Sequence, residues 1–219
     1  MKFFTTFLLI FTILLGQNSP KEIIRNISDK YDKIENMEMK VKIIADVPNL
    51  RMPVKTLKLF YIAPDSMRME VKGFAILPKN GALPFMYLRQ LADSVEFDTS
   101  YTELVNGKEM MNITLSDTTI LKEGKLLFTV DNYLERIEKV DLMMNENVVS
   151  TMNFTYQNID GFWMPDTTQF DFTMSKRIPY ASAPSISNPF GSVDIGSKED
   201  HFQNDGKVQL IFSDFKINK

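Results

Sequence analysis

The sequence has 219 residues, a formal net charge of −3 at pH 7 and no cysteine. Without cysteine, a disulfide framework, a thiolate metal site and a thiol nucleophile are all excluded. Acidic and basic side chains are interspersed along the chain, which argues against a nucleic-acid partner.

The first 17 residues have the composition of a secretory leader. Lys2 precedes an apolar run over residues 3–15 that is too short to span a bilayer, and Gly16 follows as a small residue suited to cleavage. We interpret residues 1–17 as a cleaved signal peptide, with an uncleaved anchor as the alternative. A bacterial lipoprotein would need a cysteine after this run, so lipidation is excluded. The remaining residues 18–219 suffice for one domain and hardly for two.

Residues 19–34 have the pattern of a capped amphipathic helix. Ser19, Pro20 and Glu22 stand in the order of a capping box, with Ser19 as the N-cap and Pro20 at the first helical position. The pattern predicts a helix over residues 20–34 with one buried stripe. The apolar residues of this stripe are Ile23, Ile24, Ile27, Tyr31 and Ile34.

From residue 37 the apolar residues alternate, as in a strand with one buried face. Alternation occurs over residues 37–43, 57–61 and 67–71, with a turn predicted at Pro64-Asp65 before the third run. An antiparallel meander is therefore predicted.

Residues 78–95 interrupt this alternation. Prolines at 78 and 84 and Gly81 break the strand pattern, and apolar side chains follow on more than one side. We expect a short helix that lies over a sheet face or closes an apolar cavity, because such a segment is unstable in water.

Strand patterns resume in the second half of the chain. Asn145-Glu146-Asn147 predicts a turn, and Asp160-Gly161 predicts a tight hairpin. The predicted strands cover residues 109–115, 125–130, 135–144 and 148–157, and a run with Phe170, Phe172 and Met174 on one side.

The end of the chain combines a long loop with a last strand. Residues 176–206 are rich in proline, serine and glycine and are predicted to form a functional or mobile loop. The last strand covers residues 207–217, where a change of phase predicts a bulge near Ser213.

No pattern in the sequence points to catalysis. His201, the single histidine, lies in the predicted loop without a second strong metal ligand nearby. No serine has the Gly-x-Ser-x-Gly context of a nucleophile. The pairs Asp131/Glu135 and Asp166/Asp171 lie beside turns or on outward strand positions, where solvation is the commoner role. We therefore expect no enzyme, no metal and no cofactor.

Adaptable apolar residues are abundant instead, with 14 Met and 17 Phe. Methionine packs against irregular partners, so it serves both ordinary cores and surfaces that hold flexible apolar ligands. Composition leaves both uses open.

The order of these patterns resembles the LolA-like family of periplasmic lipoprotein carriers, with its LolB and RseB-type relatives. The resemblance rests on the first helix running into Met37-Glu38-Met39-Lys40-Val41, on Ala63-Pro64-Asp65-Ser66-Met67-Arg68-Met69-Glu70, on the late pair 149–156 and 160–165, and on the closing residues 208–218.

The resemblance implies a mainly β fold: a curved antiparallel sheet or incomplete β-barrel, with an N-terminal helix and a short helical lid over an apolar cavity. Arg68 matches the arginine of the family's Pro-Asp-x-x-Arg strand, where we expect a cross-strand pair. The residues expected to line the cavity are Met39, Val41, Leu57, Leu59, Met67, Met69, Met152, Phe154, Phe170, Phe172, Leu210 and Phe212. The lid is expected to contain Phe85, Met86, Leu88 and Leu91.

The implied function is a non-catalytic periplasmic carrier that shields the acyl chains of a lipoprotein or lipid on the way to the outer membrane. Its expected partners are that cargo, an inner-membrane releasing transporter and an outer-membrane acceptor. We expect a monomer.

Four alternatives remain. The same apolar residues would also suit a closed core without a cavity. An RseB-type regulatory sensor of lipids or peptides would use a similar first domain, although the chain has no room for a second. A cell-envelope interaction module would use the sheet edges and the 176–206 loop. A hydrolase would need a polar cleft containing His201.

Overall fold

The structure, a computed structural model, describes residues 19–48, 52–64, 66–71, 83, 85, 88, 97–115, 124–144, 146–174 and 204–219. The predicted signal peptide lies outside these ranges, as do Asp65, Asn145 and all but the last three residues of the predicted 176–206 loop. In chain order the elements are α2 (Pro20–Asp29), β1 (Asn36–Asp46), β2 (Lys55–Ile62), β3 (Ser66–Glu70), β4 (Thr99–Val105), β5 (Lys108–Leu115), β6 (Gly124–Asp131), β7 (Arg136–Met144), β8 (Asn147–Ile159), β9 (Phe162–Met174) and β10 (Asn204–Ile217).

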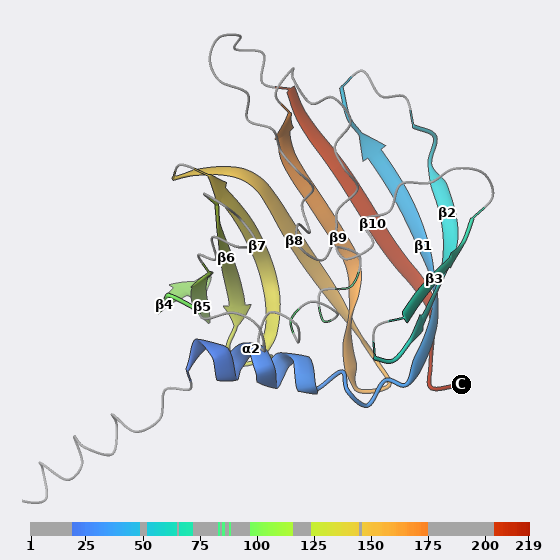
Figure 1. The fold of residues 1–219 in the computed structure, drawn as a ribbon, viewed down its shortest axis with the longest axis horizontal. Helices are drawn as coiled ribbons and strands as arrows, with labels where there is room; N and C mark the ends of the chain where they lie inside the picture. The colour runs from blue at the N-terminus through green and yellow to red at the C-terminus, as the bar shows by residue number, and fades with distance from the viewer. Residues whose placement is uncertain are drawn as a thin grey trace, which may run out of the picture.

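The strands form one antiparallel sheet in the order β3-β2-β1-β10-β9-β8-β7-β6-β5-β4. β1 to β3 and β4 to β10 each pair with their chain neighbours, β3 and β4 are not paired, and β10 returns to pair with β1 (Figure 1). β3 and β4 are the two edges, so the sheet is not closed into a barrel. The predicted mainly β fold with a curved, incomplete barrel is confirmed.

Helix α2 begins where the capping box predicts. The Ser19 backbone N–H donates to Glu22 Oε2 at 2.8 Å, and the Glu22 N–H donates to Ser19 Oγ at 3.2 Å. The predicted end at residue 34 is wrong, because α2 ends at Asp29. Turns follow in which the N–H groups of Tyr31, Asp32 and Ile34 each donate to the carbonyl oxygen three residues earlier. Tyr31 and Ile34 are buried there.

Two hairpins use left-handed backbone positions. Asn106-Gly107 joins β4 to β5 with φ of 53° and 77°, and Asp160-Gly161 joins β8 to β9 with φ of 52° and 90°. The second hairpin was predicted. Strand β4 was not predicted, although Asn106-Gly107 is a strong hairpin signal.

The last strand contains the predicted bulge. Glu38 of β1 pairs with Lys216, whereas Lys40 pairs with Ser213, so β10 carries one extra residue here. Asp214 within it has φ of 56°. β10 begins at Asn204, three residues before the predicted start.

The core lies between one face of the sheet and α2. Figure 1 shows α2 across the lower ends of β6 and β7. Its buried residues Ile23, Ile24 and Ile27 join the same apolar cluster as the strand residues. Among the residues that the structure describes, no helix is long and apolar enough to cross a membrane.

Candidate functional site: the covered inner face of the sheet

The strand register brings the twelve predicted cavity residues to one face, which we call the inner face. Leu57 pairs with Val41, and Val41 with Phe212. On the other side of β10, Val208 pairs with Phe170 and Phe170 with Met152. Because side chains alternate along each strand, these pairs fix which positions share the face.

Most of these residues are buried. Three of the twelve are half-buried, namely Met67 and Met69 on the edge strand β3 and Phe172 near the end of β9. The nine buried ones are Met39, Val41, Leu57, Leu59, Met152, Phe154, Phe170, Leu210 and Phe212.

Residues from the other half of the sheet extend the inner face. Met152 pairs with Val140, Val140 with Phe128, and Phe128 with Ile113, so an apolar row continues from β8 to β5. These residues lie in predicted strands, and their alternation was the signal that could have identified them. The buried additions are Met37, Ile43, Met111, Ile113, Leu115, Leu126, Phe128, Val130, Val140 and Leu142.

The cover consists of α2, the turn after it and two residues of the predicted lid. Phe85 and Leu88 are helical and buried; Met86 and Leu91 lie outside the described residues. The ring of Tyr31 stacks on Phe85 with centroids 4.5 Å apart.

The cover fits closely on the sheet in the described part of the chain. A gap of about 10 Å³ remains between them, lined by Ile27, Tyr31, Phe85, Leu88, Ile137, Tyr156 and Pro165. That volume is about enough for one water molecule.

Polar groups anchor the cover at its rim. The Tyr31 hydroxyl donates to the Trp163 carbonyl oxygen at 2.6 Å, and the Tyr156 hydroxyl donates to the Ile137 carbonyl oxygen. Burial raises the pKa of both tyrosines above the ordinary value, so both hydroxyls stay protonated and donate.

A half-buried cation completes this rim. The Arg136 guanidinium lies 4.9 Å from the Tyr156 ring and 4.7 Å from the Trp163 ring, and its Nε donates to Glu138 at 2.7 Å. These contacts hold β7, β8 and β9 together where the cover ends.

One polar side chain on the inner face has no partner. Thr168 pairs with Phe154 on one side and Leu210 on the other, and it is fully buried. Among the described residues, the Thr168 hydroxyl is the buried side-chain polar group that has no hydrogen-bond partner.

Solved structures share this architecture. An outer membrane lipoprotein-sorting protein domain from Vibrio parahaemolyticus is 12% identical, with a TM-score of 0.56 over 91% of this chain and 92% of that chain. A LolA superfamily protein from Nitrosomonas europaea is 10% identical, with a TM-score of 0.50 over 93% of this chain and 95% of that chain. This chain shares its fold with these two proteins.

A further structural neighbour is a DUF1329 family protein from Desulfovibrio piger. It is 9% identical, with a TM-score of 0.53 over 90% of this chain and 91% of that chain. No protein-family model matches the sequence, and no curated protein does. The predicted resemblance is confirmed by the fold alone.

The fold does not bring the candidate acidic pairs into one reactive site. Asp131 is buried and accepts the N–H groups of Tyr133 and Leu134, while Glu135 forms an ion pair with Lys30. Asp171 accepts from Gln169 Nε2 at 2.6 Å. His201 lies outside the described residues.

The Asp166 carboxylate accepts hydrogen bonds from Thr155 Oγ1 at 3.4 Å and from Thr167 Oγ1 at 3.3 Å. These contacts account for Asp166 as a residue that supports the sheet. In the ranges that the structure covers, no three His, Asp or Glu side chains are grouped to hold a metal ion.

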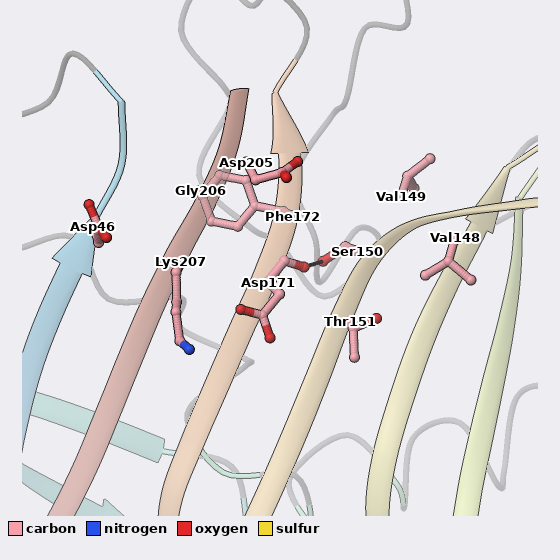
Figure 2. A pocket seen from close by; sticks show the side chains of 10 residues that line it. All are labelled: Asp46, Val148, Val149, Ser150, Thr151, Asp171, Phe172, Asp205, Gly206 and Lys207. Atoms are coloured by element: carbon pink, nitrogen blue, oxygen red, sulfur yellow. Dashed lines mark hydrogen bonds between the residues drawn. The ribbon is translucent and has the colours of Figure 1, made fainter. Parts of the chain in front are cut away.

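The LolA-like sheet also carries a polar groove of about 420 Å³ over the ends of β8, β9 and β10. Figure 2 shows Lys207, Asp171 and Thr151 beside one another on adjacent strands, with the Ser150 hydroxyl donating to the Asp171 carbonyl oxygen at 3.2 Å. The register places these three residues on the opposite face from the inner one.

Proposed function

We propose that this protein carries the acyl chains of lipoproteins or lipids between its inner face and the cover, without catalysis. The observation that supports this is the apolar inner face, which continues across the sheet with Thr168 as a buried polar residue within it and is covered by a helix and by Phe85 and Leu88. The neighbour described as an outer membrane lipoprotein-sorting protein domain favours the same cargo class.

Shielding is the physical task of such a carrier. Each exposed methylene costs about 0.8 kcal/mol in water, so one long acyl chain costs on the order of 10 kcal/mol. Burial against methionine and aromatic side chains offsets this cost, and methionine adapts to chains of different shape.

Loading requires the cover to move. Ligand pockets usually measure about 300 to 1,000 Å³, whereas the gap under α2 measures about 10 Å³. We infer that acyl chains enter as α2 separates from the sheet.

The cellular setting belongs to the same proposal. The apolar run over residues 3–15 supports export by a cleaved signal peptide into the periplasm. The carrier then works as a monomer that receives cargo from an inner-membrane releasing transporter and delivers it to an outer-membrane acceptor.

The first test is native mass spectrometry of the mature protein purified from a Gram-negative periplasm, followed by identification of extracted lipids. We expect a bound acyl species. A ligand-free protein that also fails to take up an added palmitoyl fluorescent probe would contradict the proposal.

Variants locate the binding face. Met69 and Phe172 are half-buried on the inner face, so Met69→Asp and Phe172→Asp are expected to weaken binding of the palmitoyl probe at least about tenfold, because a carboxylate beside an acyl chain is poorly solvated. Val148→Asp changes an exposed residue of β8 and serves as the matched control, with binding unchanged. Circular dichroism of each variant checks the fold.

One observation favours a second candidate, an envelope interaction module. Edge strand β4 exposes Tyr101, Leu104 and Val105, and Leu104 is 78% exposed. If the mature protein binds no acyl species, cross-linking through Leu104→Cys is the experiment that identifies a partner at this edge.

A further inference from the structure

The outer face of the sheet carries a second groove, at the opposite ends of β1 and β10 from the groove of Figure 2. It measures about 480 Å³ and lies over β3, β2, β1 and the end of β10. Glu38, Phe60, Ile62, Arg68, Lys216 and Lys219 are among the residues that line it. We call it the basic groove.

The groove lies on the opposite side of the sheet from the acyl-binding face. Tyr61 and Met37 pair with each other on the inner side, so their neighbours Phe60 and Glu38, which also pair with each other, point outward. Phe60 pairs in turn with Arg68, and Glu38 with Lys216. A ligand of the inner face and a partner of the basic groove therefore do not compete for space.

Positive charge is concentrated around this groove. The surrounding cations are Lys40, Lys42, Lys58, Arg68, Lys216 and Lys219, against the carboxylates Glu38, Glu70 and Asp214. The chain as a whole has a net charge of −3, so this region reverses the sign of the molecule. An anionic partner is the complement of such a surface.

The carboxylates hold the cations without covering them. Arg68 NH2 lies 3.1 Å from Glu70 Oε1, yet the Arg68 side chain is 70% exposed. Lys216 Nζ lies 3.2 Å from Glu38 Oε1 and its side chain is 56% exposed. Both cations therefore remain available to a second anion.

Apolar side chains lie between these charges. Ile62 is 59% exposed and lies beside Phe60, whose ring is 4.7 Å from the Arg68 guanidinium carbon. Basic residues with exposed aliphatic and aromatic groups suit the interface of a bilayer, where phosphates and acyl carbons meet.

We propose that the basic groove docks this protein on the surface of a membrane that contains anionic phospholipids. Arg68 and Lys216 contact headgroup phosphates, and Ile62 enters the interfacial layer. The inference goes beyond the proposed carrier function, because it assigns the surface by which a carrier meets a membrane and leaves the cargo site free.

Co-sedimentation of the mature protein with vesicles tests the proposal. The vesicles contain either phosphatidylcholine alone or phosphatidylcholine with about one third phosphatidylglycerol, at low salt. We expect binding to the anionic vesicles that weakens as salt is added. Equal binding to both compositions, or none to the anionic vesicles, would overturn the proposal.

Paired variants identify the surface. Arg68→Gln with Lys216→Gln is expected to lower binding to anionic vesicles by up to about 25-fold, since each basic residue near such a surface contributes about fivefold. Lys108→Gln with Lys125→Gln removes the same charge from β5 and β6 and is expected to keep binding within about twofold. An equal loss in both pairs would overturn the assignment to this groove.

Uptake of the palmitoyl probe separates this proposal from the carrier function. The Arg68/Lys216 variant is expected to take up the probe as the wild type does, because neither residue lies on the inner face. Loss of vesicle binding with intact uptake supports two independent surfaces. Loss of uptake in this folded variant would overturn their independence.

Discussion

Thr168 is a polar residue on the inner face, where the other side chains described above are apolar. Its neighbours across the strands are Phe154 and Leu210, both buried, and its hydroxyl has no hydrogen-bond partner. An unsatisfied buried hydroxyl costs about 1 to 3 kcal/mol relative to a satisfied one. The residue therefore lowers the stability of the unliganded fold.

Replacing the hydroxyl with a methyl group is expected to stabilise the protein. Thr168→Val keeps the shape of the side chain and should raise the free energy of unfolding by about 1 kcal/mol. Urea denaturation followed by circular dichroism measures the change. Thr151→Val is the comparison, because the Thr151 hydroxyl donates to Asp141 at 2.7 Å and its removal should destabilise. A destabilised Thr168→Val would show that the hydroxyl has a partner in solution.

Arg68 illustrates a residue whose neighbours depend on the register. We expected a cross-strand pair, and the cross-strand neighbour is the Phe60 ring, whereas the ion pair runs along β3 to Glu70. The guanidinium therefore has one aromatic and one acidic contact and still faces solvent.

The junction between α2 and β1 depends on the far end of the chain. Asn218 Oδ1 accepts the N–H groups of Glu35 and Asn36 at 2.8 and 3.3 Å, and its Nδ2 donates to the Lys33 carbonyl oxygen at 2.7 Å. Asn218 has φ of 53°, a conformation that asparagine tolerates better than most residues. The contact ties the end of the helical cover to the sheet.

Loss of this contact should loosen the junction. Asn218→Ala removes three hydrogen bonds and places alanine at positive φ, so we expect the free energy of unfolding to fall by about 2 kcal/mol. Asn218→Gly removes the same bonds without the backbone strain, so its free energy of unfolding should fall by about half as much. Thermal and urea unfolding of both variants tests this, and equal losses would assign the whole effect to the side chain.

The edge strands differ in what they expose. β3 is five residues long and turns Met67 and Met69 toward the core, whereas β4 leaves Leu104 and Val105 in solvent. Short edges limit pairing with other chains, so β4 is the strand more exposed to such pairing.

Two tyrosine hydroxyls support the place where the cover meets the sheet. The Tyr31 hydroxyl joins the turn after α2 to β9, the Tyr156 hydroxyl joins β8 to β7, and desolvation raises the pKa of each. Because the folded pKa exceeds the unfolded value of about 10, their contribution to stability is fully present below pH 10 and is lost as the pH rises further.

Alkaline unfolding tests this arrangement. We expect the free energy of unfolding to fall above pH 10 by up to about 1.4 kcal/mol per pH unit for each tyrosine. The double variant Tyr31→Phe/Tyr156→Phe should be less stable than the wild type at pH 8. Between pH 10 and pH 11, however, its free energy of unfolding should fall less than that of the wild type. Urea titrations at these pH values measure both slopes, and parallel losses would contradict the role of these two hydroxyls.

The sequence by itself determined the local elements of this protein. Ser19 and Glu22 set the start of α2, and the alternation of apolar residues identified every strand except β4, because caps and periodicity act within a few residues of the chain. The register places the twelve residues that the resemblance proposed for the cavity on one face, since parity along a strand decides which face a side chain joins.

Only the tertiary structure decided which of these elements meet. The end of α2 at Asp29, the stacking of Tyr31 on Phe85 and the Arg136 contacts with Tyr156 and Trp163 join residues far apart in sequence. The basic groove exists because β10 returns to pair with β1 and brings Lys216 beside Glu38. Such contacts follow from the pairing of distant strands, and no local pattern of side chains encodes the order of that pairing.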